Sequence, residues 1–237
     1  MDRTLLLATR NPGKRREYEM MLCTTLPEGW DFCDIGSWPG EIPDVVEDRA
    51  TFVGNAIKKA VESARATGCA ALSEDSGLVV DALGGAPGVH SARFSAPNPT
   101  GAKNNALLIE RLHGVPDAER TARYVALLCL AIPDDPCGRE LLDLLDHSFG
   151  GLPAGEPAKE GCVGLVEEFA VVWFRGTVEG RIVDEARGDG GFGYDPHFLV
   201  PMWNKRMAEV PAEQKNRISH RARALGKLAA TLKSKAL

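Results

Sequence analysis

Long apolar runs are missing from this 237-residue chain. No stretch approaches the about 20 consecutive apolar residues that a membrane-spanning helix needs. The opening sequence MDRTLLLATRNPGK has a short apolar run, but neither an adequate hydrophobic region nor the small-residue cleavage site of a signal peptide. We therefore expect a cytoplasmic protein that does not enter a membrane, and we interpret this opening as a first strand.

Cysteine spacings typical of metal sites are missing as well. No C-x-x-C pair occurs, and no histidine stands at metal-ligand spacing. Reduced thiols are therefore expected at Cys23, Cys33, Cys69, Cys129, Cys137 and Cys162.

The chain has no excess of positive charge. Its 28 basic and 33 acidic residues give a formal net charge of −5. Nucleic-acid polymers are bound by clustered basic residues that displace counterions, so this balance argues against such a partner. A single nucleotide remains possible, because a few local basic residues suffice for one triphosphate. Hydrophobic residues make up 44% and charged residues 26%, as in folded globular proteins.

Strand and helix patterns are interleaved along the chain. Apolar and β-branched sequence predicts strands over 3–9, 69–72, 121–132 and 169–178. Helical spacing of apolar residues predicts helices over 15–22, 51–67 and 103–112 and at the C-terminus. We expect Gly176 or Gly180 to mark a hairpin, and 133–168 to be a surface insertion with one short helix. These patterns indicate an α/β protein with a mixed sheet, folded as a single domain.

Adjacent acids and a hydroxyl at positions 74–76 are the most informative feature. We expect Glu74, Asp75 and Ser76 to emerge at the end of the strand over 69–72, where side chains can converge on a ligand. The alternative is that they are solvated loop residues and that Gly77 completes a turn. Unusual segments near positions 9, 47 and 192 favour a metal-dependent, phosphate-handling site.

The segment TRNPGK (9–14) follows a predicted strand and precedes a predicted helix. Backbone N–H groups and a helix dipole can hold phosphate at such a place, and Lys14 would add a positive charge. The segment is not a P-loop, because the first glycine is missing and Arg15 replaces the final Ser or Thr. The alternative is an ordinary surface turn.

Glu47 lies just before the helix over 51–67, which carries Lys59. Glu47 could meet Asp75 and share one Mg²⁺ with it, because this ion takes a few carboxylates together with substrate phosphate oxygens. The alternative is that both Glu47 and Lys59 are solvated surface residues.

The sequence GDGGFG (188–193) satisfies G-x-G-x-x-G, but the following YDPHFLVP cannot begin a helix. The dinucleotide-binding interpretation is therefore discarded. We interpret the segment as a loop that presents Phe192 to a flat base, with Tyr194 and Asp195 behind it. The alternative is that Phe192 is a core residue.

The sequence KNRISHR (215–221) places polar and charged donors at the start of the last predicted helix. Lys215, His220 and Arg221 could read a base edge or a phosphate. The alternative for His220 is a surface or capping role.

Five segments in order make the chain resemble the inosine triphosphate pyrophosphatase family, also called XTP/dITP diphosphatases. They are ATRNPGK (8–14), TFVGNAIKKA (51–60), SEDSGLVVDALGGAPGVHSARFS (73–95), GGFGYDPHF (190–198) and SHR (219–221). The resemblance spans nearly the whole chain apart from 133–168. It implies an elongated mixed β-sheet flanked by helices, two lobes with the nucleotide in a central cleft, and a homodimer.

The resemblance further implies Mg²⁺-dependent hydrolysis of ITP, dITP and XTP to the monophosphate and pyrophosphate, which cleanses the nucleotide pool. Carried over by motif, the triphosphate would be bound by Thr9, Arg10, Asn11, Pro12, Gly13, Lys14 and Lys59, and supported by Ser76 and Arg93. Glu47 and Asp75 would hold the metal, and Asp75 would also be the general base. The base would be held and read by Phe192, Gly193, Tyr194, Asp195, Lys215, His220 and Arg221.

Three positions depart from the family pattern. Gly54 stands where Glu is frequent, Glu74 where Asp is common, and Arg10 where Gly is frequent. We expect Gly54 to loosen the start of its helix and Arg10 to alter phosphate affinity. Two other functions are compatible with these segments: a nucleotide-binding sensor without catalysis, and a pyrophosphatase of other modified nucleotides.

Overall fold

A computed structural model describes residues 3–22 and 26–233 of the chain. The chain divides into two compact units, each built from separate segments. Unit 1 comprises Met1–Asp75, Leu127–Arg175 and Ala224–Leu237, and unit 2 comprises Ser76–Ala126 and Gly176–Arg223.

The strands form one eight-stranded mixed sheet in the order β2-β1-β3-β4-β6-β7-β8, and β5 also pairs with β6. Strand β1 is parallel to both β2 and β3, whereas the pairs β5–β6, β6–β7 and β7–β8 are antiparallel. The strand bounds are β1 Thr4–Ala8, β2 Asp31–Asp34, β3 Ala70–Val80, β4 Thr121–Ile132, β5 Val163–Val166, β6 Phe169–Ile182, β7 Phe198–Val200 and β8 Lys205–Arg206. The predicted α/β class with a mixed sheet is confirmed.

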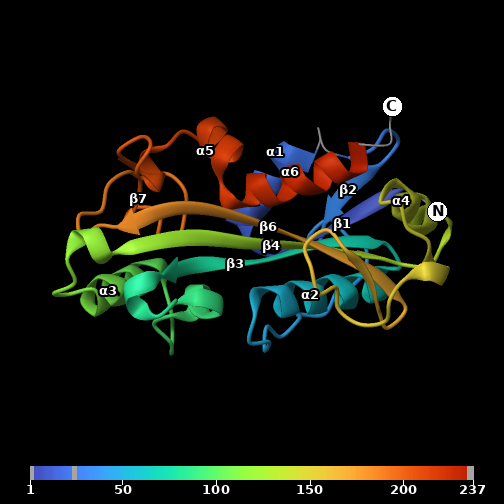
Figure 1. Ribbon diagram of the computed structural model, residues 1–237, viewed down its shortest axis with the longest axis horizontal. Helices are drawn as coiled ribbons and strands as arrows, with labels where there is room; N and C mark the ends of the chain where they lie inside the picture. The colour runs from blue at the N-terminus through green and yellow to red at the C-terminus, as the bar shows by residue number, and fades with distance from the viewer. Residues whose placement is uncertain (1–2, 23–25, 234–237) are drawn as a thin grey trace. The chain divides into compact units, whose positions relative to one another are not determined.

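Helices cover both faces of the strands in unit 1. Helices α1 and α6 lie on one face and α2 lies on the other (Figure 1). The helix bounds are α1 Pro12–Leu22, α2 Phe52–Thr67, α3 Gly101–Arg111, α4 Pro136–Leu144, α5 Ala212–Ile218 and α6 His220–Lys233. This layering buries β1, whose Leu6 is fully inaccessible to solvent.

Helix α2 has the amphipathic character that its sequence predicts. Its buried face includes Ile57 and Val61, spaced by one turn. Thr51 caps the first turn, because its side-chain oxygen accepts a hydrogen bond from Gly54 N at 3.0 Å. Gly68 ends the helix in the left-handed conformation, with φ of 72°. Gly54 therefore lies in a capped first turn, and the expected loosening of the helix start by this glycine stays a prediction.

Unit 2 has its own hydrophobic core. Helix α3 contributes Leu108 to it, and the strands contribute Leu78, Tyr124 and Phe198. The rings of Tyr124 and Phe198 lie 4.6 Å apart between centroids and are tilted by 43°. This core includes Tyr194 of the loop 186–197, which contains four of the predicted base-binding residues, Phe192, Gly193, Tyr194 and Asp195.

Two expectations about strand ends are wrong. Strand β3 does not stop at Leu72 but continues to Val80, because apolar residues resume after Gly77 and bury the second half of the strand. Strand β6 likewise passes through Gly176 and Gly180 without a hairpin. At Gly180, an added Cβ would lie 2.4 Å from the ring of Phe198, so this glycine permits close packing and does not mark a turn.

The segment 133–168 contains more regular structure than its sequence predicts. It contains α4, a short 3₁₀ turn and strand β5, which pairs with β6. Leu141 and Leu142 of α4 are buried, so part of the segment belongs to the core of unit 1.

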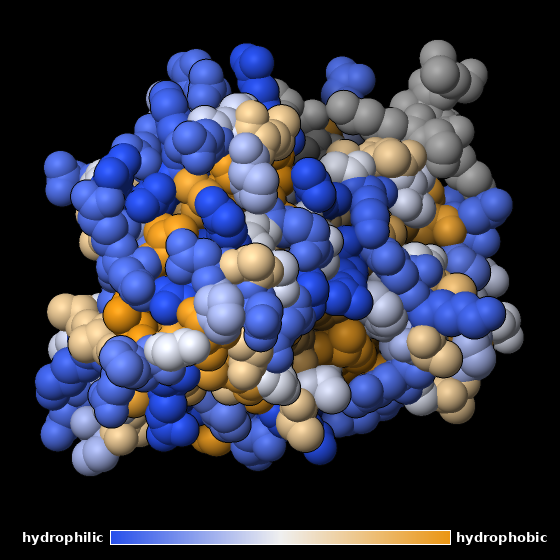
Figure 2. All heavy atoms as spheres, turned by 60° about the vertical axis from the view of Figure 1, so that its left-hand side comes forward, coloured by the Kyte–Doolittle hydropathy of each residue, from blue (hydrophilic) through white to orange (hydrophobic). Residues whose placement is uncertain are grey.

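Most of the molecular face in Figure 2 is hydrophilic, with small apolar areas between the charged side chains. Within the described ranges, the large hydrophobic side chains with high exposure are Met20, Val46 and Met202. No helix in these ranges is long and apolar enough to cross a membrane. No disulfide links the described cysteines, Cys33, Cys69, Cys129, Cys137 and Cys162, and Cys23 lies outside the described residues.

Candidate functional site

The predicted phosphate-binding segment joins β1 to α1. Strand β1 ends at Ala8, opposite Ser73 of the parallel strand β3, so the loop that follows lies level with Glu74. Asn11 Oδ1 accepts hydrogen bonds from Gly13 N at 2.9 Å and from Lys14 N at 3.1 Å. The segment Pro12–Lys14 is therefore the first turn of α1, which begins three residues before the predicted helix over 15–22, and the N–H groups of Gly13 and Lys14 lie at the helix N-terminus.

Three side chains of this segment, those of Thr9, Arg10 and Lys14, contact other residues of unit 1. Thr9 Oγ1 accepts a hydrogen bond from Asn11 N at 3.2 Å. The Lys14 ammonium lies 3.3 Å from Glu74 Oε1, and both side chains are largely buried. Arg10 binds the loop before α2, through an ion pair with Asp44 and a hydrogen bond to a backbone carbonyl.

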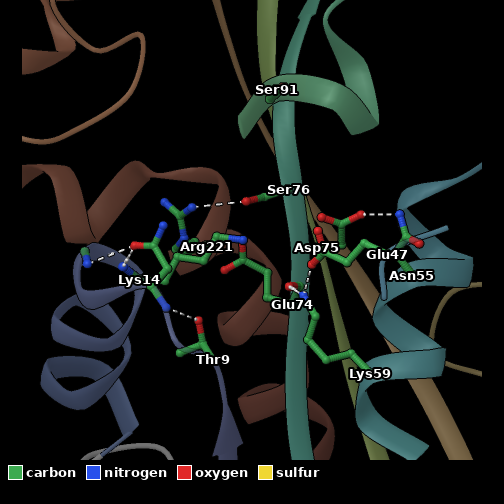
Figure 3. A network of polar contacts seen from close by, with 12 residues as sticks. Thr9, Lys14, Glu47, Asn55, Lys59, Glu74, Asp75, Ser76, Ser91 and Arg221 are labelled. Atoms are coloured by element: carbon green, nitrogen blue, oxygen red, sulfur yellow. Dashed lines mark hydrogen bonds and ion pairs between the residues drawn. The ribbon is translucent and has the colours of Figure 1, made fainter. Parts of the chain in front are cut away.

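Glu74 and Asp75 point to opposite faces of β3, as alternate residues of a strand must (Figure 3). Glu74 faces α1 and Lys14, whereas Asp75 faces α2. Both carboxylates are buried within the strand, and Ser76 follows them inside β3. The expectation that Glu74, Asp75 and Ser76 emerge at a strand end is therefore wrong.

Burial raises the pKa of Asp75 above its ordinary value. The positive charge of Lys14 and a hydrogen bond from Asn55 act in the opposite direction, and the negative charge of Glu47 raises the pKa further. Asn55 Nδ2 donates to Asp75 Oδ2 at 3.0 Å. A buried carboxylate with a raised pKa is better suited to accept a proton than a solvated one.

Glu47 lies on the loop before α2 and faces the same side of β3 as Asp75 (Figure 3). Lys59 forms an ion pair with Glu47 and donates to the carbonyl oxygen of Glu74 at 3.2 Å. Two carboxylates of unit 1 are thus within electrostatic reach of each other, with lysine ammonium groups beside them.

This donor set fits Mg²⁺, which takes one or two protein carboxylates and completes its coordination with water and phosphate oxygens. A complete protein cage is not formed: no group of three or more His, Cys, Asp or Glu side chains in residues 3–22 and 26–233 could hold a metal ion. Glu47 and Asp75 would therefore hold the ion together with substrate oxygens.

In unit 2, Asp195 is the centre of a buried polar cluster. Its Oδ2 accepts hydrogen bonds from Phe192 N at 3.0 Å and from Lys215 Nζ at 2.9 Å. The Lys215 ammonium and the Arg221 guanidinium each lie 5.1 Å from the centroid of the Phe192 ring. Phe192 is half-buried, with its ring close to two cations. The loop, α5 and α6 therefore bring one aromatic ring and several hydrogen-bond donors together.

Neighbouring residues fix this loop to the fold of unit 2. The Tyr194 hydroxyl donates to Ser91 O at 2.8 Å, and Asn105 Nδ2 donates to Gly193 O at 3.1 Å. Arg93 is half-buried in the 3₁₀ segment Gly88–Arg93.

Arg221 and His220 lie at the start of α6. Arg221 Nη2 donates to Ser76 Oγ at 3.1 Å (Figure 3). His220 is buried, and its ring stacks on Tyr124 at 5.0 Å between centroids with an interplanar angle of 13°. Burial, followed by the negative charge of Asp195, raises the pKa of Tyr124 well above its ordinary value. His220 is therefore neither a surface nor a solvated capping residue.

Sequence reasoning did not identify two residues that contact this machinery. Asn55 binds Asp75, and Tyr124 stacks on His220. Asn55 carries a signal in the sequence, since it is an amide on the largely apolar face of α2. Tyr124 carries no such signal, because an aromatic residue is ordinary in a buried strand.

The chain is similar over nearly its whole length to proteins of known sequence and structure. A dITP/XTP pyrophosphatase from an Exiguobacterium species is 41% identical over 228 residues, covering 96% of this chain and 96% of that protein. A dITP/XTP pyrophosphatase from Thermus thermophilus is 40% identical over 221 residues, covering 93% and 87%. The structure of a HAM1 protein from Coxiella burnetii matches with a TM-score of 0.74 and 32% identity, covering 98% of each chain. The structure of a nucleoside-triphosphatase, dITP/XTP pyrophosphatase, from Mycobacterium abscessus matches with a TM-score of 0.65 and 34% identity, covering 95% and 98%.

The family model supports the same relationship. It matches residues 5–143 and 144–231, which together include every candidate residue described above. The chain belongs to the Ham1 family.

Proposed function

We propose that the protein hydrolyses the non-standard purine nucleotides dITP, ITP and XTP to the nucleoside monophosphate and pyrophosphate, and so cleanses the nucleotide pool. The observation that carries this proposal is the buried carboxylate of Asp75, which lies within electrostatic reach of Lys14, Lys59 and Glu47 in unit 1. A general base, cations and a second carboxylate are the groups that phosphoanhydride hydrolysis needs.

In the proposed reaction, the Asp75 carboxylate accepts a proton from the water molecule that attacks the α-phosphorus. The bond from the α-phosphorus to the bridging oxygen breaks, and pyrophosphate leaves with that oxygen. Lys14, Lys59 and the positive end of the α1 dipole neutralise and orient the triphosphate. Mg²⁺, held by Glu47 and Asp75, would supply further neutralisation of charge on the phosphate oxygens.

The polar cluster of unit 2 supports selection of the base. Hypoxanthine and xanthine present an O6 acceptor, which suits donors such as Arg221, whereas adenine presents an N6 donor. Opposing two donors costs about 1–3 kcal/mol, or roughly 5- to 150-fold in affinity per contact. Phe192 offers a flat apolar surface on which a base can stack. We expect Ser76 and Arg93 to support the phosphates, and we further propose that the enzyme is a cytoplasmic homodimer.

A competition assay tests the proposal. The purified protein is incubated with ITP, XTP, dUTP, ATP and GTP, with and without Mg²⁺, and released pyrophosphate is measured. We expect release from ITP and XTP, dependence on Mg²⁺, and much slower release from ATP. Preference for dUTP would overturn the assignment to purine substrates, and no release from any nucleotide would overturn the enzymatic function.

A further inference from the structure

Two lysines of α2 hold the loop on which Glu47 lies. Lys58 Nζ donates to Val46 O at 2.8 Å and to Asp48 Oδ1 at 2.9 Å, on either side of Glu47. Lys59 forms an ion pair with Glu47 itself. The surface of α2 therefore fixes where the Glu47 carboxylate lies.

Asn55, one turn before these lysines, links the same loop to Asp75. It is 1% exposed, and both ends of its amide are engaged. Its Oδ1 accepts a hydrogen bond from Arg49 N at 2.9 Å, two residues after Glu47, and its Nδ2 donates to Asp75 Oδ2 at 3.0 Å (Figure 3). One side chain thus contacts the segment of one candidate metal ligand and the carboxylate of the other.

The chemistry of these contacts allows only one orientation of the amide. Rotating it by half a turn would set its oxygen against the Asp75 carboxylate and its NH₂ group against the backbone donor of Arg49. An amide fixed in this way orients the carboxylate that it binds, because a buried donor and acceptor are costly to leave unsatisfied.

We propose that Asn55 is a positioning residue that sets the geometry between Asp75 and the Glu47 loop. This inference rests on the proposed function, since Asp75 is the general base only if the protein hydrolyses nucleotides. Asn55 does not itself contact the reacting atoms in this account. It acts through its donor to Asp75 and its acceptor for Arg49 N, and the donor can be removed while the acceptor is kept.

Asn55→Asp keeps an acceptor for Arg49 N but replaces the donor to Asp75 with a second carboxylate oxygen, at nearly constant volume. We expect kcat for dITP at saturating Mg²⁺ to fall about 10- to 100-fold, since small displacements of a catalytic group cost this much. We expect KM to change by less than about threefold, because the substrate-binding groups stay in place. Hydrogen exchange of the Arg49 amide, followed by ¹⁵N NMR without nucleotide, should stay close to that of the wild type.

Asn55→Ala removes both contacts, so we expect the loss of kcat together with faster exchange of the Arg49 amide.

Ser73→Ala is the matched control. Ser73 Oγ donates to Ala56 O at 2.5 Å, so this change also removes a buried hydrogen bond between β3 and α2 but does not touch Asp75. We expect this control to retain the wild-type kcat and the wild-type exchange of Arg49.

Several results would overturn the inference. Wild-type kcat in Asn55→Asp would show that the donor to Asp75 is dispensable, and unchanged Arg49 exchange in Asn55→Ala would show that the loop is held by other groups. An equal loss of kcat in Ser73→Ala would show that any loosening of α2 is responsible. A wild-type protein that releases no pyrophosphate would instead overturn the proposed function, and only the exchange arm would then bear on Asn55.

Discussion

Lys215 and Asp195 form a buried ion pair, with 2.9 Å between Nζ and Oδ2 and side-chain exposures of 7% and 5%. The same carboxylate oxygen also accepts a hydrogen bond from Phe192 N. Asp195 therefore serves the fold of unit 2 as well as the proposed base site, because it determines where both Lys215 and the loop around Phe192 lie.

We predict that Asp195→Ala lowers the free energy of unfolding by about 3–5 kcal/mol, because it removes the counter-charge of a buried ammonium group. Equilibrium urea denaturation measures this loss. Glu185→Ala is the control, because Glu185 pairs with Arg187 on the surface, and its removal should leave the unfolding free energy unchanged. Equal effects of the two substitutions would show that burial of the Lys215–Asp195 pair does not contribute to stability.

Gly191 adopts φ of 74°, and an added Cβ would lie 2.1 Å from Asp195 Oδ2. Gly191→Ala should therefore displace the Asp195 carboxylate and raise KM for dITP more than it lowers kcat. Gly84→Ala provides the comparison, since Gly84 has φ of 62° but no atom within 4 Å of its added Cβ. In both variants, alanine in the left-handed conformation costs about 1–2 kcal/mol. A larger rise in KM for Gly191→Ala than for Gly84→Ala is therefore due to the clash with Asp195. Identical KM values in the two variants would contradict this account.

Gly226 lies in α6, where an added Cβ meets no atom within 4 Å. We expect Gly226→Ala to raise the free energy of unfolding by about 0.5–1 kcal/mol, because alanine loses less backbone entropy in a helix. The same substitution at Gly180 should destabilise, because its Cβ would lie 2.4 Å from the Phe198 ring and 2.5 Å from Leu199 O. Thermal unfolding of both variants checks the opposite signs, and destabilisation by Gly226→Ala would contradict the prediction.

Asp75→Asn should nearly abolish pyrophosphate release and leave the protein folded. The raised pKa of Asp75 means that the folded state favours the protonated form, so the charged carboxylate costs stability at neutral pH. In metal-free buffer, the variant should unfold at the same or a higher temperature than the wild type at neutral pH. This difference should disappear below the ordinary carboxyl pKa, where the wild type is also protonated. Near-normal turnover in the variant would exclude Asp75 as the base.

The fold could be predicted where local pattern and tertiary structure agree. The spacing of Ile57 and Val61 predicts α2 because that face is also the buried one. The prediction failed at β3, where Glu74, Asp75, Ser76 and Gly77 have the composition of a turn. These residues remain in a strand because Lys14 and Asn55 provide charged and polar contacts to the buried acids. Such partners, distant in sequence, cannot be read from local composition.

The candidate site, like the fold, could be predicted from the sequence only in part. Motifs identified Asp195 and Lys215 as polar residues of one site but did not indicate that the two side chains bind each other. The contacts of Asn55 and Tyr124 depend on how a helix and a strand pack, so their contribution emerges only from the three-dimensional structure.

Unit 1 contains the segment from Ala224 onward, which follows every residue of unit 2 in the chain. Leu225 and Leu228 of this segment are buried, so the core of unit 1 is incomplete without them. During synthesis on the ribosome, unit 2 therefore has all of its residues before unit 1 does. Unit 1, which carries Asp75, therefore completes its core only after every residue of unit 2 has been synthesised.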